Sequence, residues 1–349
     1  YYAGPGALDP VRISIPKGSY VPVIDANTAG AQNAESAPEL PIYESFRKQP
    51  QNALPCHPSI AVLPLEYLGQ EPEHNYVASG ITEEVIVALS RFPEFLVVGP
   101  LDKKKIRQVG MDPRDIGSDY QVRFLFDGTV RLRGDSLRIL ARLTDTFSGQ
   151  QLWARAFDYD IATSTVGQLE NEIVGQVVAQ IADNFGVIPR TLAKEVLSRH
   201  DESLSDYRAI LLFHHHVRTV TEKSLTDAIV AMEQVVQRDP NHDLALALLG
   251  DLITGPYWLG YTDDRSDLER AAHLTQRALA LNPNSQAAHF TMAIVCYLTD
   301  QNARCLAEID EAILLNPNNA NYAANSALFL VGLGELDRGY RLIQKAMQL

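Results

Sequence analysis

The chain has 349 residues, enough for two or three domains with hydrophobic cores. Its 46% hydrophobic and 21% charged residues exclude a disordered or fibrous protein, and no apolar run approaches the roughly 18 residues of a membrane span. A formal charge of −13 argues against non-specific nucleic-acid binding, and three cysteines are too few for a disulfide framework. We therefore expect a soluble multidomain protein.

Residues 1–23 contain a predicted β-hairpin. Apolar and polar residues alternate over residues 11–15, a turn signal follows at residues 16–18, and residues 19–23 form a second short β segment. A lone hairpin is marginal in water, and the chain starts at Tyr1 without a leader, so we expect the hairpin to pack on an upstream domain. It resembles the terminal wing of a winged-helix module, and also the Pro-Lys-Gly-Ser-Tyr-Val-Pro stretch that closes a helical DNA-binding-like region in some bacterial regulators. The alternative is an ordered tail that packs locally.

Residues 24–57 are rich in Ala, Asn, Pro, Gln and Ser and predict a flexible linker. An α/β (α+β) mixed-sheet domain is predicted after it, over residues 58–187. Its first half contains buried strands at residues 59–64 and 95–98, a helix between them that Ser79 caps, and a short basic helix at residues 102–108.

The second half of this domain shows the clearest periodicity in the chain. Alternating apolar and polar residues predict an antiparallel meander over residues 121–133, 137–144 and 152–159. A helix at residues 166–185 carries an apolar stripe that can cover the meander. In the middle strand, the face expected to be buried consists of Leu137, Ile139, Ala141 and Leu143.

Residues 188–349 contain an internal repeat. Leu281-Asn282-Pro283-Asn284 recurs 34 residues later as Leu315-Asn316-Pro317-Asn318, which is the tetratricopeptide period of one helix pair. We expect about four repeats, the first degenerate, with a nine-residue insertion near residues 255–263. The first helices of the pairs are predicted at residues 205–219, 242–256, 286–299 and 320–333, and stacking of the pairs predicts an all-α tetratricopeptide superhelix.

Two modules are recognisable at this point. Residues 59–160 resemble the TolB amino-terminal-like domain that precedes tetratricopeptide repeats in many bacterial proteins. Leu65 departs from the usual Phe, and Ser79 from a frequent Asp. The resemblance implies no catalytic residues in this stretch; family members sit beside winged-helix DNA-binding domains or class III nucleotide-cyclase domains. The matching residues are Ser59-Ile60-Ala61-Val62-Leu63-Pro64, Gly80-Ile81-Thr82-Glu83-Glu84, Asp115-Ile116-Gly117, Gly128-Thr129-Val130-Arg131, Asp145, Gly149, Leu152-Trp153-Ala154 and Asp158-Tyr159.

Motifs that carry chemistry are weak. Three consecutive histidines, residues 214–216, point about 100° apart on a helix and cannot converge on one metal ion, so no metal or other cofactor is expected. Cys296 and Cys305 fall at repeat positions that face the helix-pair core and are interpreted as small buried hydrophobes, with a disulfide as the alternative. Cys56 beside His57 lacks an orienting third group. We therefore expect no catalytic residue in this chain.

Two binding surfaces are predicted. The polar face of the meander carries a local excess of arginine and is predicted to contact an acidic partner. The alternative is that this face is only solvated. Its candidate residues are Arg123, Arg131, Arg133, Arg138 and Arg142. The concave groove of the repeats is expected to bind a protein partner. The alternative is that some of this surface covers further repeats or the insertion around Trp258. The candidate residues of the groove are Phe290, Ile294, Tyr297 and Leu328.

Three functions are compatible with these features. The leading one is a non-catalytic regulatory scaffold that binds a protein partner through the repeats, with the α/β domain as a docking or sensing module. The others are the carboxy-terminal part of a transcriptional regulator, which contacts nucleic acid only through an upstream domain, and the regulatory half of an adenylate or guanylate cyclase. A cytoplasmic location is expected, with the periplasm as the alternative. The partner and the oligomeric state are not predicted.

Overall fold

The computed structural model describes residues 11–14, 23–26, 58–69, 74–101, 112–160, 166–198, 206–262 and 264–349, and it divides into two compact units, Tyr1–Ala53 and Leu54–Leu349. The first unit contains an antiparallel hairpin of β1 (Val11–Ser14) and β2 (Val23–Ala26). The second strand therefore begins at the end of the predicted segment and enters the predicted linker, because Val23 and Ile24 are strong β-formers. The rest of the predicted linker lies outside the described residues.

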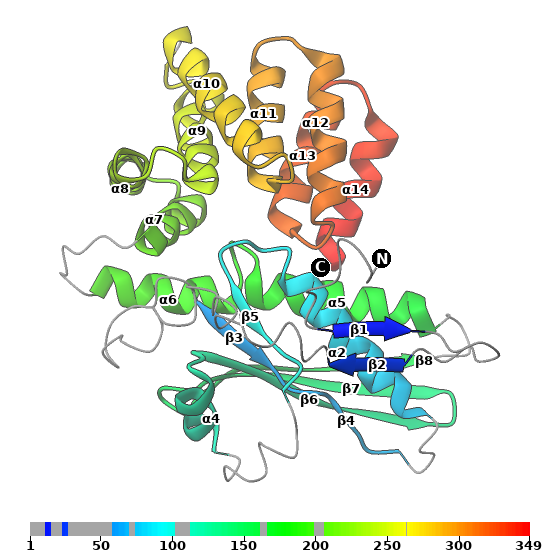
Figure 1. Ribbon diagram of the computed structural model, residues 1–349. Helices are drawn as coiled ribbons and strands as arrows, with labels where there is room; N and C mark the ends of the chain where they lie inside the picture. Colours follow the sequence, from blue (N-terminus) through cyan, green and yellow to red (C-terminus); the bar gives the residue numbers. More distant parts are fainter. Residues whose placement is uncertain are drawn as a thin grey trace. The chain divides into compact units, whose positions relative to one another are not determined.

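The second unit begins with a six-stranded mixed sheet (Figure 1). Along the sheet the order is β5-β3-β6-β7-β8, and β4 also pairs with β6. β3 runs parallel to β5 and β6, whereas β6, β7 and β8 form the predicted antiparallel meander. The strands are β3 (Ser59–Val62), β4 (Glu66–Tyr67), β5 (Leu96–Val98), β6 (Phe124–Arg133), β7 (Ser136–Asp145) and β8 (Gln151–Asp160).

One face of the sheet holds the main core. Helices α2 (Asn75–Leu89) and α5 (Val166–Ala182) pack on it, and the four apolar residues predicted for the buried face of β7 are at most 2% exposed. The other face is covered in part by α4 (Pro113–Tyr120), whose Ile116 lies in a small cluster with Val122 and Leu125. The meander prediction is therefore confirmed, although one end of its expected polar face is also covered.

One local prediction, the Ser79 cap, is wrong, and another lies outside the described residues. α2 starts four residues before Ser79, and the Ser79 hydroxyl donates to the Asn75 carbonyl at 3.3 Å from within the helix instead of capping it. The early start follows from the apolar residues Val77 and Ala78, which are buried and extend the core-facing stripe by one turn. The predicted basic helix at residues 102–108 lies outside the described residues.

The rest of the second unit is helical, and it confirms the predicted fold class of a mixed sheet followed by tetratricopeptide-like helix pairs. In the described residues after α6 (Val187–Ser198), eight helices form four pairs. They are α7 (Asp206–Thr219) with α8 (Glu222–Arg238), α9 (Asp243–Trp258) with α10 (Arg265–Leu281), α11 (Gln286–Leu298) with α12 (Asn302–Leu315), and α13 (Ala320–Gly332) with α14 (Leu336–Gln348).

Small residues allow the two helices of a pair to approach closely. A Cβ added to Gly250 on α9 would lie 2.8 Å from the Thr275 hydroxyl of α10, so this position needs glycine. Cys305 and Ala312 on α12 are fully buried at the predicted packing positions. The expected insertion begins as helix, since residues 255–258 form the last turn of α9 and lengthen it to 16 residues against 13 in α11 and α13.

Candidate functional site

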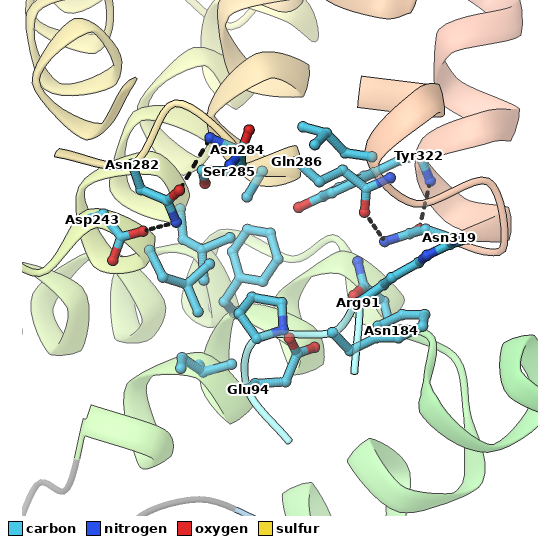
Figure 2. Close-up of a pocket in the computed structure, with 18 of the residues that line it drawn as sticks. Arg91, Glu94, Asn184, Asp243, Asn282, Asn284, Ser285, Gln286, Asn319 and Tyr322 are labelled. Carbon is cyan, nitrogen blue, oxygen red and sulfur yellow. Dashed lines mark hydrogen bonds between the residues drawn. The ribbon is translucent and has the colours of Figure 1, made fainter. Parts of the chain in front are cut away.

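A cavity of about 260 Å³ lies where the loop after α2 meets the first helices of the repeat pairs (Figure 2). The loop contributes residues 90–94, and the facing wall comes from α7, α9 and the amino-terminal ends of α11 and α13. Apolar side chains of Phe92, Phe213 and Leu248 line part of it, and amide, carboxyl and imidazole groups line the rest. The cavity is therefore made jointly by the sheet domain and the repeats.

The amide side chains of this cavity form hydrogen bonds both within helix pairs and between them. Asn282 donates through Nδ2 to Asp243 Oδ2 at 2.7 Å and accepts from the Asn284 backbone N–H (Figure 2). Gln286 donates to the Ala312 carbonyl at 2.8 Å and accepts from Asn319 Nδ2 at 3.2 Å. The bonds of Asn282 thus hold the Asn-Pro-Asn motif against the first helix of its own pair, and the bond between Gln286 and Asn319 joins the third pair to the fourth.

Two titratable groups in the cavity, His214 and Glu94, do not form a hydrogen bond with each other. His214 on α7 is 3% exposed, and neither of its ring nitrogens has a hydrogen-bond partner among the described residues. Glu94 Oε1 lies 3.9 Å from His214 Nε2, too far for a hydrogen bond. Burial lowers the pKa of His214 to about 3 and raises the pKa of Glu94 to about 7. The opposite shifts favour the neutral form of each group, so we interpret them as neutral neighbours rather than as an ion pair.

Further carboxyl groups lie near the same wall. Asp183, which follows α5, accepts through Oδ2 from the Asn321 backbone N–H at 3.0 Å and so caps the start of α13. Burial raises the pKa of Asp183 to about 6 and that of Asp251 on α9 to about 7. Burial, together with the charges of Asp251, Glu94 and Asp183, raises the pKa of Tyr322 on α13 well above its usual value. The phenol thus lies close enough to three acids for their charges to act on it.

The predicted groove residues separate into two groups. Phe290 and Ile294 are only 4% and 6% exposed, which corrects the expectation that they lie open. The reason is that the Phe290 ring stacks on Tyr322 of the next first helix, with centroids 4.3 Å apart. Tyr297 is half-buried, and Leu328 is 57% exposed. Of the four, Leu328 and Tyr297 remain available for a partner.

Apolar side chains at the end of α9, on α11 and on α13 are exposed in whole or in part, and we use the name Trp258 surface for four of them: Trp258, Tyr297, Leu328 and Val331. Trp258 ends α9, and its ring centroid lies 5.8 Å from that of Tyr297 and 5.1 Å from that of Phe329. Leu328 and Val331 lie one turn apart on α13. The sequence places Trp258 in an insertion, and the alternative given for the groove is that part of its surface covers this insertion.

Four of the arginine residues predicted for an acidic partner lie on one face of the meander, where Arg131 is paired directly with Arg138 across β6 and β7, but Arg123 is buried. Arg123 is 6% exposed, and it donates to Asp145 at 2.9 Å and to Glu195 of α6 at 2.5 Å. Arg142 is paired with Asp127, and Arg138 lies 3.5 Å from Asp158. Arg131 and Arg133 are exposed on β6. Arg123 was placed wrongly because α6, distant in sequence, covers this end of the sheet and supplies a carboxylate.

The cysteine and histidine residues singled out in the sequence do not form a metal site in the described part of the chain. Cys296 and Cys305 are free and fully buried, as predicted. His214 lines the cavity, whereas His216 Nδ1 lies 3.0 Å from the Ser224 hydroxyl. Nowhere in the described part of the chain do three His, Cys, Asp or Glu side chains gather so that they could hold a metal ion. Within the described ranges, no helix combines the length and apolar character needed to span a bilayer.

Comparison with known proteins gives several resemblances and no protein-family model that matches. Over 254 residues the chain is 26% identical to a protein of Rhizobium meliloti (strain 1021) named "Putative adenylate cyclase 3", and the alignment covers 70% of this chain and 41% of that protein. The chain thus spans about two fifths of the length of this curated relative.

Two solved structures are also similar. TTC0263, a TPR protein of Thermus thermophilus, matches 46% of this chain and 89% of its own, with 18% identity and a TM-score of 0.34. TolB from Acinetobacter baumannii matches 35% of this chain and 27% of its own, with 14% identity and a TM-score of 0.25.

Proposed function

We propose that this chain is a non-catalytic regulatory scaffold that binds a protein partner through its repeats, with the mixed-sheet domain as a docking or sensing module. The observation that carries the proposal is the Trp258 surface, in which Trp258, Leu328 and Val331 are 43%, 57% and 48% exposed. Apolar side chains grouped at the surface typically mark an interaction site, and tryptophan is enriched among the residues that dominate binding energies. In this proposal the protein acts in the cytoplasm.

A second observation supports binding of polypeptide by the repeats. The loop after α2 already lies against them, with Phe92 3% exposed and the Asn316 side chain donating to the Arg91 carbonyl at 3.4 Å. An apolar anchor and a hydrogen bond to the backbone are the two contacts that a partner peptide would use. The loop occupies the cavity side of the repeats, and the Trp258 surface remains for a partner.

The test compares two variants of the full-length protein as bait. The Leu328→Ser/Val331→Ser double variant should lose partners that the parent protein captures, while Leu314→Ser, a matched change at a 73% exposed leucine on α12, should keep them. Each captured protein is then purified, and its Kd is measured by calorimetry. We expect the double variant to bind about tenfold or more weakly at an unchanged melting temperature. Equal Kd values for all three baits would contradict the proposal.

The regulatory half of a nucleotide cyclase is the second candidate, favoured by the similarity to the Rhizobium meliloti protein over 70% of this chain. In this version the repeats receive a partner and the cyclase domain responds. The full-length protein should then convert ATP or GTP to a cyclic nucleotide, at a rate that changes when the partner is added. A full-length protein that forms neither cyclic nucleotide, with or without the partner, would exclude this candidate.

A further inference from the structure

We infer that the cavity in Figure 2 binds an organic cation, an ammonium or guanidinium group on an alkyl stem. The group can belong to a small amine or to a lysine or arginine side chain of a partner, and in the second case the inference rests on the proposed function. Both sources present the same chemistry, and the experiment below separates them.

A buried imidazole in the cavity wall, that of His214, has no hydrogen-bond partner among the described residues. His214 lines the cavity at 3% exposure, and both of its ring nitrogens lack a partner in the described part of the chain. A buried polar atom without a hydrogen bond costs about 1–3 kcal/mol, so such atoms usually face a ligand or water. Glu94, 3.9 Å away, presents a carboxyl group to the same space.

Acidic side chains lie in and near the cavity and would attract a cation. Glu94 lines the cavity, Asp183 and Asp251 lie close enough to Tyr322 for their charges to influence it, and burial raises the pKa of all three acids. Among the described residues, no lysine or arginine forms an ion pair with any of them, and Arg91 at the cavity rim is exposed. A cation that enters the cavity would therefore meet the Glu94 carboxyl group, whose ionised form has no positively charged partner among the described residues.

The size of the cavity and the apolar part of its wall suit the alkyl stem of an organic cation. Phe92, Phe213 and Leu248 can pack along an alkyl stem, and aromatic faces attract a cation. A volume of about 260 Å³ is large compared with the roughly 30 Å³ share of one water molecule, so the cavity has room for a small organic group. An anion would instead lie beside Glu94 and Asp243, which disfavours it.

Binding should depend on pH because Glu94 must be ionised to pair with a cation. Its pKa of about 7 means that much of it is protonated below pH 7. The cation should therefore bind more tightly at pH about 8 than at pH about 6, with release of a proton at the lower pH. Several titratable and charged groups surround the space that Glu94 faces. They are His214, Tyr207 and Arg218 on α7, Asp243 on α9, Asp183 after α5, Tyr322 on α13 and Arg91 on the loop of Glu94 itself.

The experiment is titration calorimetry on the intact chain with two matched pairs of probes. One pair is n-butylguanidinium and its neutral isostere n-butylurea, and the other is a blocked pentapeptide Gly-Gly-Xaa-Gly-Gly with arginine or citrulline at the centre. We expect the charged member of a pair to bind at least about tenfold more tightly than the neutral one. Binding of butylguanidinium alone identifies a small amine as the ligand, and binding of the arginine peptide identifies a partner side chain.

The variants test whether the cavity is the site. Glu94→Gln should weaken binding of the charged probe about tenfold or more and remove its pH dependence, whereas Glu83→Gln, at an exposed acid on α2, should change neither. If Glu94→Gln does not fold, the comparison of charged and neutral probes on the parent chain still decides. Equal binding of both members of each pair, or no binding of any probe, overturns the inference. No partner protein is needed, so this outcome is independent of the test of the Trp258 surface.

Discussion

At the residue scale, Arg123 illustrates how a correct strand pattern can lead to a wrong prediction for a side chain. The alternation of β6 places Arg123 on the face opposite Phe124 and Phe126, as expected for a polar face. That face is covered at this point, and Arg123 bonds to Asp145 and Glu195 while it is 6% exposed. A buried arginine needs such partners, since an unpaired buried charge costs several kcal/mol. Alternation thus assigns a side chain to a face of the sheet, but it does not show what packs on that face.

Ile139, at the centre of β7, gives a test of the strand register. The side chain is fully buried, so Ile139→Asp would place an unpaired carboxylate in the core and should lower the free energy of unfolding by about 3 kcal/mol or more. Urea unfolding followed by circular dichroism measures this. The neighbouring Arg138→Ala, at a side chain 61% exposed, should cost less than about 1 kcal/mol. If the aspartate variant unfolds like the parent, the register is wrong.

At the element scale, polar contacts connect the helices of a pair and make their packing depend on pH. His289 Nδ1 on α11 lies 2.6 Å from Glu308 Oε2 on α12, and Nε2 lies 2.9 Å from the Pro283 carbonyl. The hydrogen bond to Glu308 raises the pKa of His289. Burial alone would raise the pKa of Glu308, but the bonds from His289 and Arg304 outweigh it and lower the pKa.

The sign of the pH effect follows from the raised pKa of His289. A histidine whose pKa is higher in the folded state stabilises the protein fully below its unfolded pKa of about 6.5, and this contribution is lost as pH rises through the folded pKa. We therefore expect His289→Ala to destabilise the protein more at pH about 5.5 than at pH about 9, by about 0.5 kcal/mol or more for this largely buried pair. Urea unfolding at the two pH values measures the difference. The same pH dependence in His273→Ala, at an exposed histidine on α10, would refute this explanation.

At the scale of the whole molecule, the sheet domain and the repeats share one hydrophobic core. The main cluster includes Ile139 and Val177 of the sheet domain together with Phe213, Leu248 and Phe290 of the repeats. Polar contacts reinforce it, because Asp183 caps α13 and Arg218 of α7 donates to the Asn184 carbonyl at 2.9 Å. The boundary near residues 187–188 predicted from sequence remains a prediction, and the shared core implies that residues 58–349 unfold together.

Phe92 tests this coupling. It is 3% exposed in the loop that lies against the repeats, so Phe92→Ala should lower the free energy of unfolding by about 3 kcal/mol and weaken the contact between the two parts. Scanning calorimetry should show one transition for the parent and two for the variant. Tyr76→Ala, at a 59% exposed ring on α2, should keep one transition. Two transitions in the parent would mean that the parts unfold separately.

The amino-acid sequence by itself determined the local features of this protein. Alternation over residues 121–159 predicted the meander, and the 34-residue spacing of Pro283 and Pro317 predicted the helix pairs, because side-chain periodicity and small packing residues are local consequences of strand and helix geometry. Tertiary structure alone decided which surfaces stay exposed. Phe290 is buried by the next helix pair, and Glu94 and His214 meet across 120 residues of chain. Burial and pKa depend on these distant neighbours, which no local pattern contains.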